Sequence, residues 1–191
     1  MPSTAISRPA TSAPERLRAM SRWMRALIAF GAIFVLAAPF ALLLASDDAV
    51  QGYVANFAEE SLRSAAVSFP PMLRWWALAL ALPNVALGLF ALLQAWHLFG
   101  AYGRGVVFGA QASARLRTLG RCFIGAAVLR PATHTALMLV LTWHNPAGER
   151  QLVLAVSSDD YLCLLFGGLL LAVSWAMAEA RRIEQENAGF I

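Results

Sequence analysis

Four long stretches of the chain carry almost no charged side chains. Residues 26–45, 75–99 and 161–178 contain none, and residues 120–143 form a fourth apolar stretch that is interrupted in its interior by Arg130. A helix needs about 20 apolar residues to cross roughly 30 Å of hydrocarbon. The pattern therefore predicts four membrane-spanning helices. The third in chain order, residues 120–143, is the least regular. The first stretch is longer than the apolar core of a signal peptide, so we expect it to stay in the mature chain.

The composition agrees with a membrane protein. Charged residues make up 14% of the 191 residues, whereas soluble domains have about 25%. Such a chain is too apolar to be disordered and does not resemble an ordinary soluble enzyme. All 15 basic residues are arginines, which with 11 acidic residues give a net charge of +4. Because these arginines flank the apolar stretches and are not interleaved with aromatic residues, they indicate membrane orientation and no direct nucleic-acid binding.

The distribution of the arginines predicts the side of the membrane on which each loop lies. Eleven of them precede the first stretch, separate the second from the third, or follow the fourth, and three lie in the other two loops. Arginine-rich loops stay in the cytoplasm, so we expect both termini there. Residues 1–25 are expected to be a disordered basic tail that turns helical near residues 15–25. Residues 26–191 are expected to form the membrane domain, with residues 179–191 as a cytoplasmic helix.

The loop between the first two spans shows helical spacing of its own. Ser46-Asp47-Asp48 has the form of a helix N-cap followed by acidic residues. Apolar residues then recur at helical intervals; they are Val50, Tyr53, Val54, Phe57, Ala58 and Leu62. This pattern predicts a short amphipathic helix on the outer surface, which either caps the bundle or contributes to a ligand site. In the other outer loop, residues 157–160 (Ser-Ser-Asp-Asp) offer N-caps for the last span.

Two segments resemble a known protein family. The last span continues into a closing motif, which reads Glu179-Ala-Arg181-Arg182-Ile-Glu-Gln-Glu186-Asn187-Ala-Gly-Phe190-Ile191. The loop before the third span reads Gly105-Val-Val-Phe108 and then Arg115-Leu-Arg117-Thr-Leu-Gly120. With these motifs, residues 25–191 resemble the bacterial membrane family called domain of unknown function 2975. The resemblance implies a small four-helix protein of the bacterial inner membrane, with a small helix-turn-helix regulator as a partner and no assigned catalytic residue.

Arg130 is the most informative single residue. It lies ten residues beyond Gly120, about 15 Å by helix rise and so near the bilayer centre. A central arginine costs roughly 2.5–3.5 kcal/mol to insert, and no acidic residue lies within a predicted span. We expect Arg130, Asn84 and His134 to form a polar site at the midplane. Either Asn84 and carbonyls freed by nearby prolines satisfy Arg130, or Arg130 binds an anion or a lipid headgroup.

The remaining chemical inventory is poor. Two cysteines and three histidines form no metal-binding motif. His97 and His134 are expected at depths too different for one haem iron, and no nucleophile can be paired with a base. We therefore expect no catalytic residue, no metal and no cofactor. Cys122 is expected near the inner edge of the third span and Cys163 near the outer edge of the fourth, too far apart for a disulfide.

Two surfaces are candidates for contacts with other molecules. Gly168, Ala172 and Ala176 recur every four residues on the last span, and we expect them to pack within the bundle, with a homodimer contact as the alternative. A partner or lipid surface on the cytoplasmic side comprises Arg115, Arg117, Arg121, Arg181, Arg182, Glu186 and Phe190. The simpler interpretation of the loop arginines is that they fix the topology and contact lipid.

These features favour one function and leave an alternative. The charged cytoplasmic segments and the implied regulator favour a membrane-anchored sensor or regulator that acts through a cytoplasmic partner. The alternative is a subunit for small-molecule or ion transport that uses Arg130 and Asn84.

Overall fold

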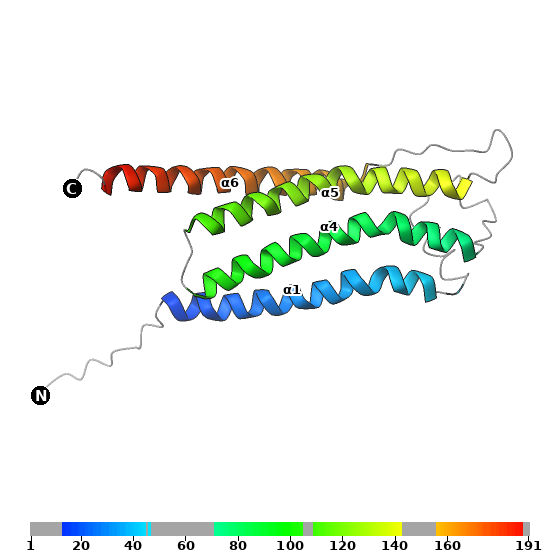
Figure 1. Cartoon of the computed structure of the whole chain (residues 1–191), viewed down its shortest axis with the longest axis horizontal. Helices are drawn as coiled ribbons and strands as arrows, with labels where there is room; N and C mark the ends of the chain where they lie inside the picture. The colour runs from blue at the N-terminus through cyan, green and yellow to red at the C-terminus, as the bar shows by residue number, and fades with distance from the viewer. Residues whose placement is uncertain (1–12, 45, 47–70, 105–108, 143–155, 189–191) are drawn as a thin grey trace, which may run out of the picture.

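A computed structural model of the protein describes residues 13–44, 46, 71–104, 109–142 and 156–188. Within these residues the chain forms four long helices, α1 (Ala13–Leu44), α4 (Pro71–Gly103), α5 (Ala110–Thr142) and α6 (Ser158–Ala188). Each contains 31 to 33 residues, and they run alternately in opposite directions (Figure 1). The expected all-α architecture of four helices is therefore confirmed.

Residues 26–44, 75–99, 120–142 and 161–178 of the predicted spans are each helical. Three of the four helices contain a segment with the length and hydropathy of a membrane span. The three segments are Leu17–Ala41, Arg74–Gly103 and Ser158–Asn187. α5 is not among them in the described part of the chain, and its sequence is interrupted by Arg115, Arg117, Arg121 and Arg130. A membrane crossing by α5 stays a prediction.

The helix ends differ from the predicted boundaries. α1 begins at Ala13, two residues before the helical segment expected near residues 15–25. α6 continues past the predicted span without interruption to Ala188. The amphipathic helix predicted after Ser46 lies outside the described residues.

Large apolar side chains cover the outer faces of the described helices. In α1, Phe30, Phe34 and Phe40 are 68%, 69% and 59% exposed. Other exposed side chains of this kind include Trp75, Trp76, Leu165, Phe166 and Trp175. In water such a surface would drive aggregation, whereas in a bilayer it contacts lipid. Together with the three apolar spans, it identifies a membrane protein.

The helices pack in the order of the sequence, α1 on α4, α4 on α5 and α5 on α6. A small core lies where the last three meet; it contains Leu98, Ala112, Leu116 and Leu119, against which Leu170 and Met177 pack. α1 is fastened to α4 near the same end, where the hydroxyl of Ser21 donates a hydrogen bond to the carbonyl oxygen of Phe99. A Cβ on Gly103 would lie 2.8 Å from Ser21 Oγ, so the two helices come this close because residue 103 is a glycine.

α5 and α6 touch backbone to backbone at Gly120 and Gly167. A Cβ on Gly120 would lie 2.8 Å from the carbonyl oxygen of Gly167. In the other direction, a Cβ on Gly167 would lie 2.7 Å from Cγ1 of Ile124. Real Cβ atoms do not come this close, so a side chain at either position would push the helices apart. The glycine pair therefore fixes the lengthwise register of α6 on α5.

The predicted packing stripe is not the face that packs. Gly168, Ala172 and Ala176 are exposed, and a Cβ on Gly168 would meet nothing within 4 Å. The packed face instead contains Gly167 and the fully buried Ser174. The expectation that the stripe packs within the bundle is wrong, because the neighbouring glycine, about 100° around the helix, makes the close contact. The homodimer alternative stays a prediction.

The adjacent glycines provide a matched test of this packing. We expect Gly167→Ala to lower the free energy of unfolding by about 1–3 kcal/mol, because the added methyl group forces α5 and α6 apart. Gly168→Ala should leave it unchanged or raise it, since alanine favours helix and the site has free space. Thermal unfolding in a mild detergent, followed by circular dichroism, measures both. Equal unfolding temperatures for the two variants would contradict the assigned contact.

Candidate functional site

The start of α6 lies beside the middle of α5 and brings two acids to Arg130. Arg130 Nη2 lies 3.9 Å from Asp159 Oδ2, and Arg130 Nε lies 3.7 Å from Asp160 Oδ1. Arg130 therefore has two carboxylate partners, neither of which is among the partners expected from the sequence, which are Asn84 with backbone carbonyls or a bound anion. The lengthwise register of the two helices explains this difference. Arg130 lies ten residues beyond Gly120 on α5, about 15 Å by helix rise. Asp160 lies seven residues before Gly167 on the antiparallel α6, about 11 Å from the same contact, so the two side chains reach similar levels.

Asp160 is held in place by the N-terminal cap of α6. Its Oδ2 accepts hydrogen bonds from the backbone N and the Oγ of Ser157, both at 2.9 Å. In return, the amide of Asp160 donates to Ser157 Oγ at 3.3 Å. This reciprocal arrangement is of the capping-box type and confirms the predicted cap.

The charge of Asp160 is compensated by Arg130. The Asp160 side chain is 6% exposed, and its Oδ1 is buried without a hydrogen-bond partner. The Arg130 side chain is 46% exposed, so its guanidinium keeps contact with the surroundings. A buried carboxylate is costly without a nearby positive charge. Arg130 is therefore a counter-ion for the start of α6.

Asn84 connects α4 to α5 and does not serve as the partner expected for Arg130. Its Nδ2 donates to Thr133 Oγ1 at 2.8 Å, and the Thr133 hydroxyl donates to the carbonyl oxygen of Leu129 at 2.8 Å. His134 Nδ1 is buried and has no hydrogen-bond partner. Within the described residues, no group of three or more His, Cys, Asp or Glu side chains is arranged to hold a metal ion.

The three residues predicted for a midplane site, Arg130, Asn84 and His134, line one cavity of about 930 Å³. We call this cavity the groove; all four helices contribute to its lining. Its apolar lining includes Phe34, Val35, Leu87, Leu92, Phe123 and Leu137, and its polar lining includes Thr133, Ser157, Asp159 and Asp160. The volume is in the range of small-molecule sites, and such sites combine apolar walls with a few polar groups.

Both cysteines also line the groove. Cys122 and Cys163 are free thiols, and each contributes to the same cavity wall. The structure brings both to one cavity, whereas the predicted spans separate them to opposite ends of the bundle. α6 is shifted along α5 relative to the predicted spans, since Gly167 lies beside Gly120, at the inner edge of the predicted third span.

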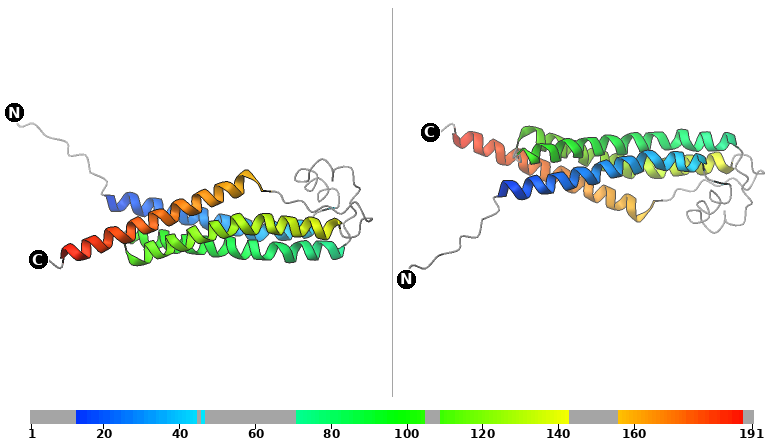
Figure 2. Two further views of the ribbon diagram at one scale, coloured as in Figure 1. Left: turned by 90° about the horizontal axis from the view of Figure 1, so that it is seen from above. Right: turned by 90° about the horizontal axis from the view of Figure 1, so that it is seen from below.

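At its other end α6 projects beyond the ends of α4 and α5, as the red end of the helix shows in Figures 1 and 2. Where α6 passes the start of α5, Arg181 connects the two helices, because Arg181 Nη2 donates a hydrogen bond to Ser113 Oγ at 2.6 Å. On the surface of the same helix, Arg182 Nη1 lies 3.6 Å from Glu179 Oε1, and Arg182 Nε lies 3.0 Å from Glu186 Oε1. We call residues 179–188 the α6 extension.

The residues of the predicted partner surface therefore differ in burial and in the contacts that they make. Arg181 and Arg182 bond within the protein. Arg115 and Arg117 are partly buried, and Arg121 is exposed. Phe190 lies outside the described residues.

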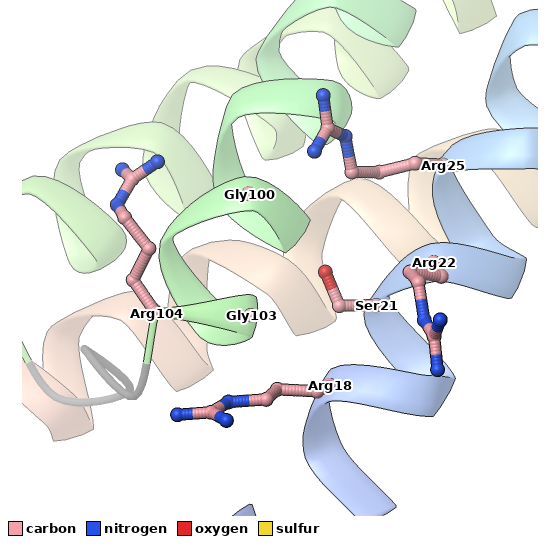
Figure 3. Close-up of a pocket in the computed structure, with 7 residues that line it drawn as sticks. All are labelled: Arg18, Ser21, Arg22, Arg25, Gly100, Gly103 and Arg104. Carbon is pink, nitrogen blue, oxygen red and sulfur yellow. The ribbon is translucent and has the colours of Figure 1, made fainter. Parts of the chain in front are cut away.

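A second cavity, of about 490 Å³, lies between α1 and α4 (Figure 3). Its lining consists of Arg18, Ser21, Arg22, Arg25, Gly100, Gly103 and Arg104; we call it the arginine pocket. From the sequence alone, these arginines served only to predict the topology. The missed signal is the spacing of Arg18, Ser21 and Arg25, which places all three on one face of α1.

Comparisons with known proteins give one family. A family model with the description "Protein of unknown function (DUF2975)" matches residues 61–191. No curated protein and no solved structure matches the chain. The match confirms the resemblance seen in the closing motif.

The ion pair of Arg130 and Asp160 can be tested by a double-mutant cycle. Arg130→Gln should destabilise the protein, because it leaves a buried carboxylate without a counter-ion. Adding Asp160→Asn should restore part of the loss, with a coupling of about 1 kcal/mol in the unfolding free energy. Asp159→Asn is the control, because that side chain is 72% exposed and should contribute little. Additive effects of Arg130→Gln and Asp160→Asn would show that the two residues do not interact.

Proposed function

The chain belongs to the DUF2975 family, and on this premise we propose that it is a sensor or regulator in the bacterial cytoplasmic membrane that acts through a cytoplasmic protein partner. Both termini lie in the cytoplasm in this proposal, in accordance with the arginine distribution. The partner is a small helix-turn-helix regulator.

One observation carries the proposal: α6 alone among the described helices has one end in the groove and the other end beyond the bundle. Asp159, Asp160 and Cys163 line the groove, and the same helix continues without interruption to Ala188. An apolar molecule with a polar end that enters the groove meets the ion pair that fixes the start of α6. If it binds one position of α6 more tightly than another, it shifts the α6 extension.

The α6 extension has the features of an output segment. Its side chains from Arg182 to Asn187 are exposed, and the extension carries charged groups of both signs, three glutamates and two arginines. An exposed charged helix offers a partner electrostatic complementarity. Its tether to α5, the hydrogen bond from Arg181 to Ser113, is one polar contact. Such contacts are individually weak enough to exchange when the helix moves.

Transport is the second candidate, favoured by the groove itself. A cavity of about 930 Å³ that contains Arg130, Asn84 and His134 among apolar walls resembles the midplane sites of small carriers. Purified protein in proteoliposomes, with a voltage-sensitive dye and gradients of common ions, tests this alternative. Flux that Arg130→Gln abolishes would support transport over regulation.

The movement of α6 can be measured directly. Spin labels at Gln111→Cys and Gln185→Cys, in a background of Cys122→Ser and Cys163→Ser, report the distance from the start of α5 to the α6 extension. Asp160→Asn should shift or broaden the distance distribution by about 2 Å or more, because it releases the start of α6. Asp159→Asn should leave it unchanged. An unaltered distribution in the Asp160→Asn protein would mean that the ion pair does not control α6.

The output can be tested by affinity capture of the full-length protein from solubilised membranes. Deletion of residues 183–191 should abolish the retrieval of a cytoplasmic protein while the helix content and melting behaviour persist. Deletion of residues 2–12 is the control, since it shortens the other terminus. Arg115→Ala with Arg121→Ala should weaken the retrieval less. If the C-terminal truncation retrieves the same partners as the full-length chain, the extension is not the output and transport becomes the leading function.

A further inference from the structure

The arginine pocket contains four guanidinium groups whose charges are not balanced within the described residues. Arg18, Arg22 and Arg25 come from α1, and Arg104 follows the end of α4. The ion pairs among the described residues involve Arg130 and Arg182 instead. The lining contains no acidic residue, and Glu15, one turn before Arg18, is exposed and not part of it. Like charges gathered at one site repel unless an anion joins them.

The arginines are arranged around an open space. Figure 3 shows the side chains of Arg18 and Arg25 extending from α1 on either side of Ser21, with Arg104 on the α4 side. Gly100 and Gly103 keep the α4 wall free of side chains. The hydroxyl of Ser21 is used in its bond to Phe99, which fixes α1 against α4 at the mouth of the pocket. The pocket is thus held open by helix packing.

Arg25 is held in position without an acceptor for its own hydrogens. Its guanidinium carbon lies 4.0 Å from the centroid of the Trp96 ring, a cation–π contact. Its Nε is buried and has no hydrogen-bond partner. The contact with the ring orients the guanidinium without using its Nη donors, and arginine recognises phosphate through such planar donors.

The pocket lies at the predicted boundary of the hydrocarbon. Arg25 immediately precedes the first predicted span, and Gly100 immediately follows the second. Phosphate groups of lipids lie at this depth, and basic pockets between helices on the cytoplasmic side bind anionic headgroups. A dissolved phosphate compound reaches the same depth from the water.

We propose that the arginine pocket binds a phosphate group, with Arg18, Arg25 and Arg104 as its ligands. The phosphate comes either from the phosphodiester headgroup of an anionic phospholipid or from free phosphate in solution. The site is separate from the groove and does not depend on the proposed function. It would fasten the cytoplasmic ends of α1 and α4 to each other, because its ligands come from both helices.

The test compares two matched pairs of substitutions in the full-length protein. Arg18→Gln with Arg104→Gln removes two exposed pocket arginines, and Arg63→Gln with Arg150→Gln removes the same charge from the two predicted outer loops. Each protein, in a neutral detergent, is titrated with phosphatidylglycerol and, separately, with inorganic pyrophosphate. Binding is read by native mass spectrometry and by the shift in unfolding temperature. Arg25→Lys, which keeps the charge and loses the planar donor pair, is a third variant that guards against misfolding of the double variant.

We expect the pocket pair to weaken binding about tenfold or more, and the outer-loop pair less than about twofold. Arg25→Lys should also weaken it. Binding of phosphatidylglycerol alone assigns the pocket to a lipid headgroup, and binding of pyrophosphate alone assigns it to a soluble phosphate; binding of both supports the shared chemistry. The proposal is overturned if neither probe binds the wild-type protein, if the pocket variants bind as tightly as wild type, or if the outer-loop pair loses as much affinity as the pocket pair.

Discussion

The contact between the backbones of Gly120 and Gly167 is the constraint on which the rest of the structure depends. It allows α5 and α6 to approach without side chains between them and so fixes where α6 begins along α5. With this register, the capped end of α6 meets Arg130, and Cys163 enters the same cavity as Cys122. A shift of α6 by one helical turn would displace the two acids by about 5.4 Å along α5, relative to Arg130.

The ion pair explains how a charged residue can be accommodated in the middle of an apolar helix. Asp160 is buried but held by two hydrogen bonds from Ser157, whereas Arg130 remains half-exposed beside the groove. The two opposite charges reduce each other's free-energy cost of leaving water. The cap hydrogen bonds position the carboxylate of Asp160 independently of Arg130. The groove is polar at this end because the helix starts there.

Most of the helical architecture was predictable from the sequence, because long uncharged stretches and the Ser157 cap are local signals. The relation between helices was not. Counting from the edges of their own spans places Arg130 and Asn84 at one depth. The same counting places Asp159 and Asp160 in the outer loop before the last span. Counting in this manner assumes that the ends of all helices lie in two common planes, whereas α6 begins beside the middle of α5. The packing face of α6 was missed for a related reason: Gly167 and Gly168 are both small, and only the partner helix selects between them.

The position of the glycine contact along α6 has a mechanical consequence. Gly167 lies seven residues from Asp160 and twenty-one residues from Ala188, which are arms of about 11 Å and about 32 Å on a straight helix. A rigid rod that rocks on such a fulcrum moves its long end about three times as far as its short end. A displacement of 1 Å at the ion pair, roughly what a bound molecule requires, then becomes about 3 Å outside the bundle. The bond from Arg181 to Ser113 lies on the long arm, so it would have to open for such a movement to occur.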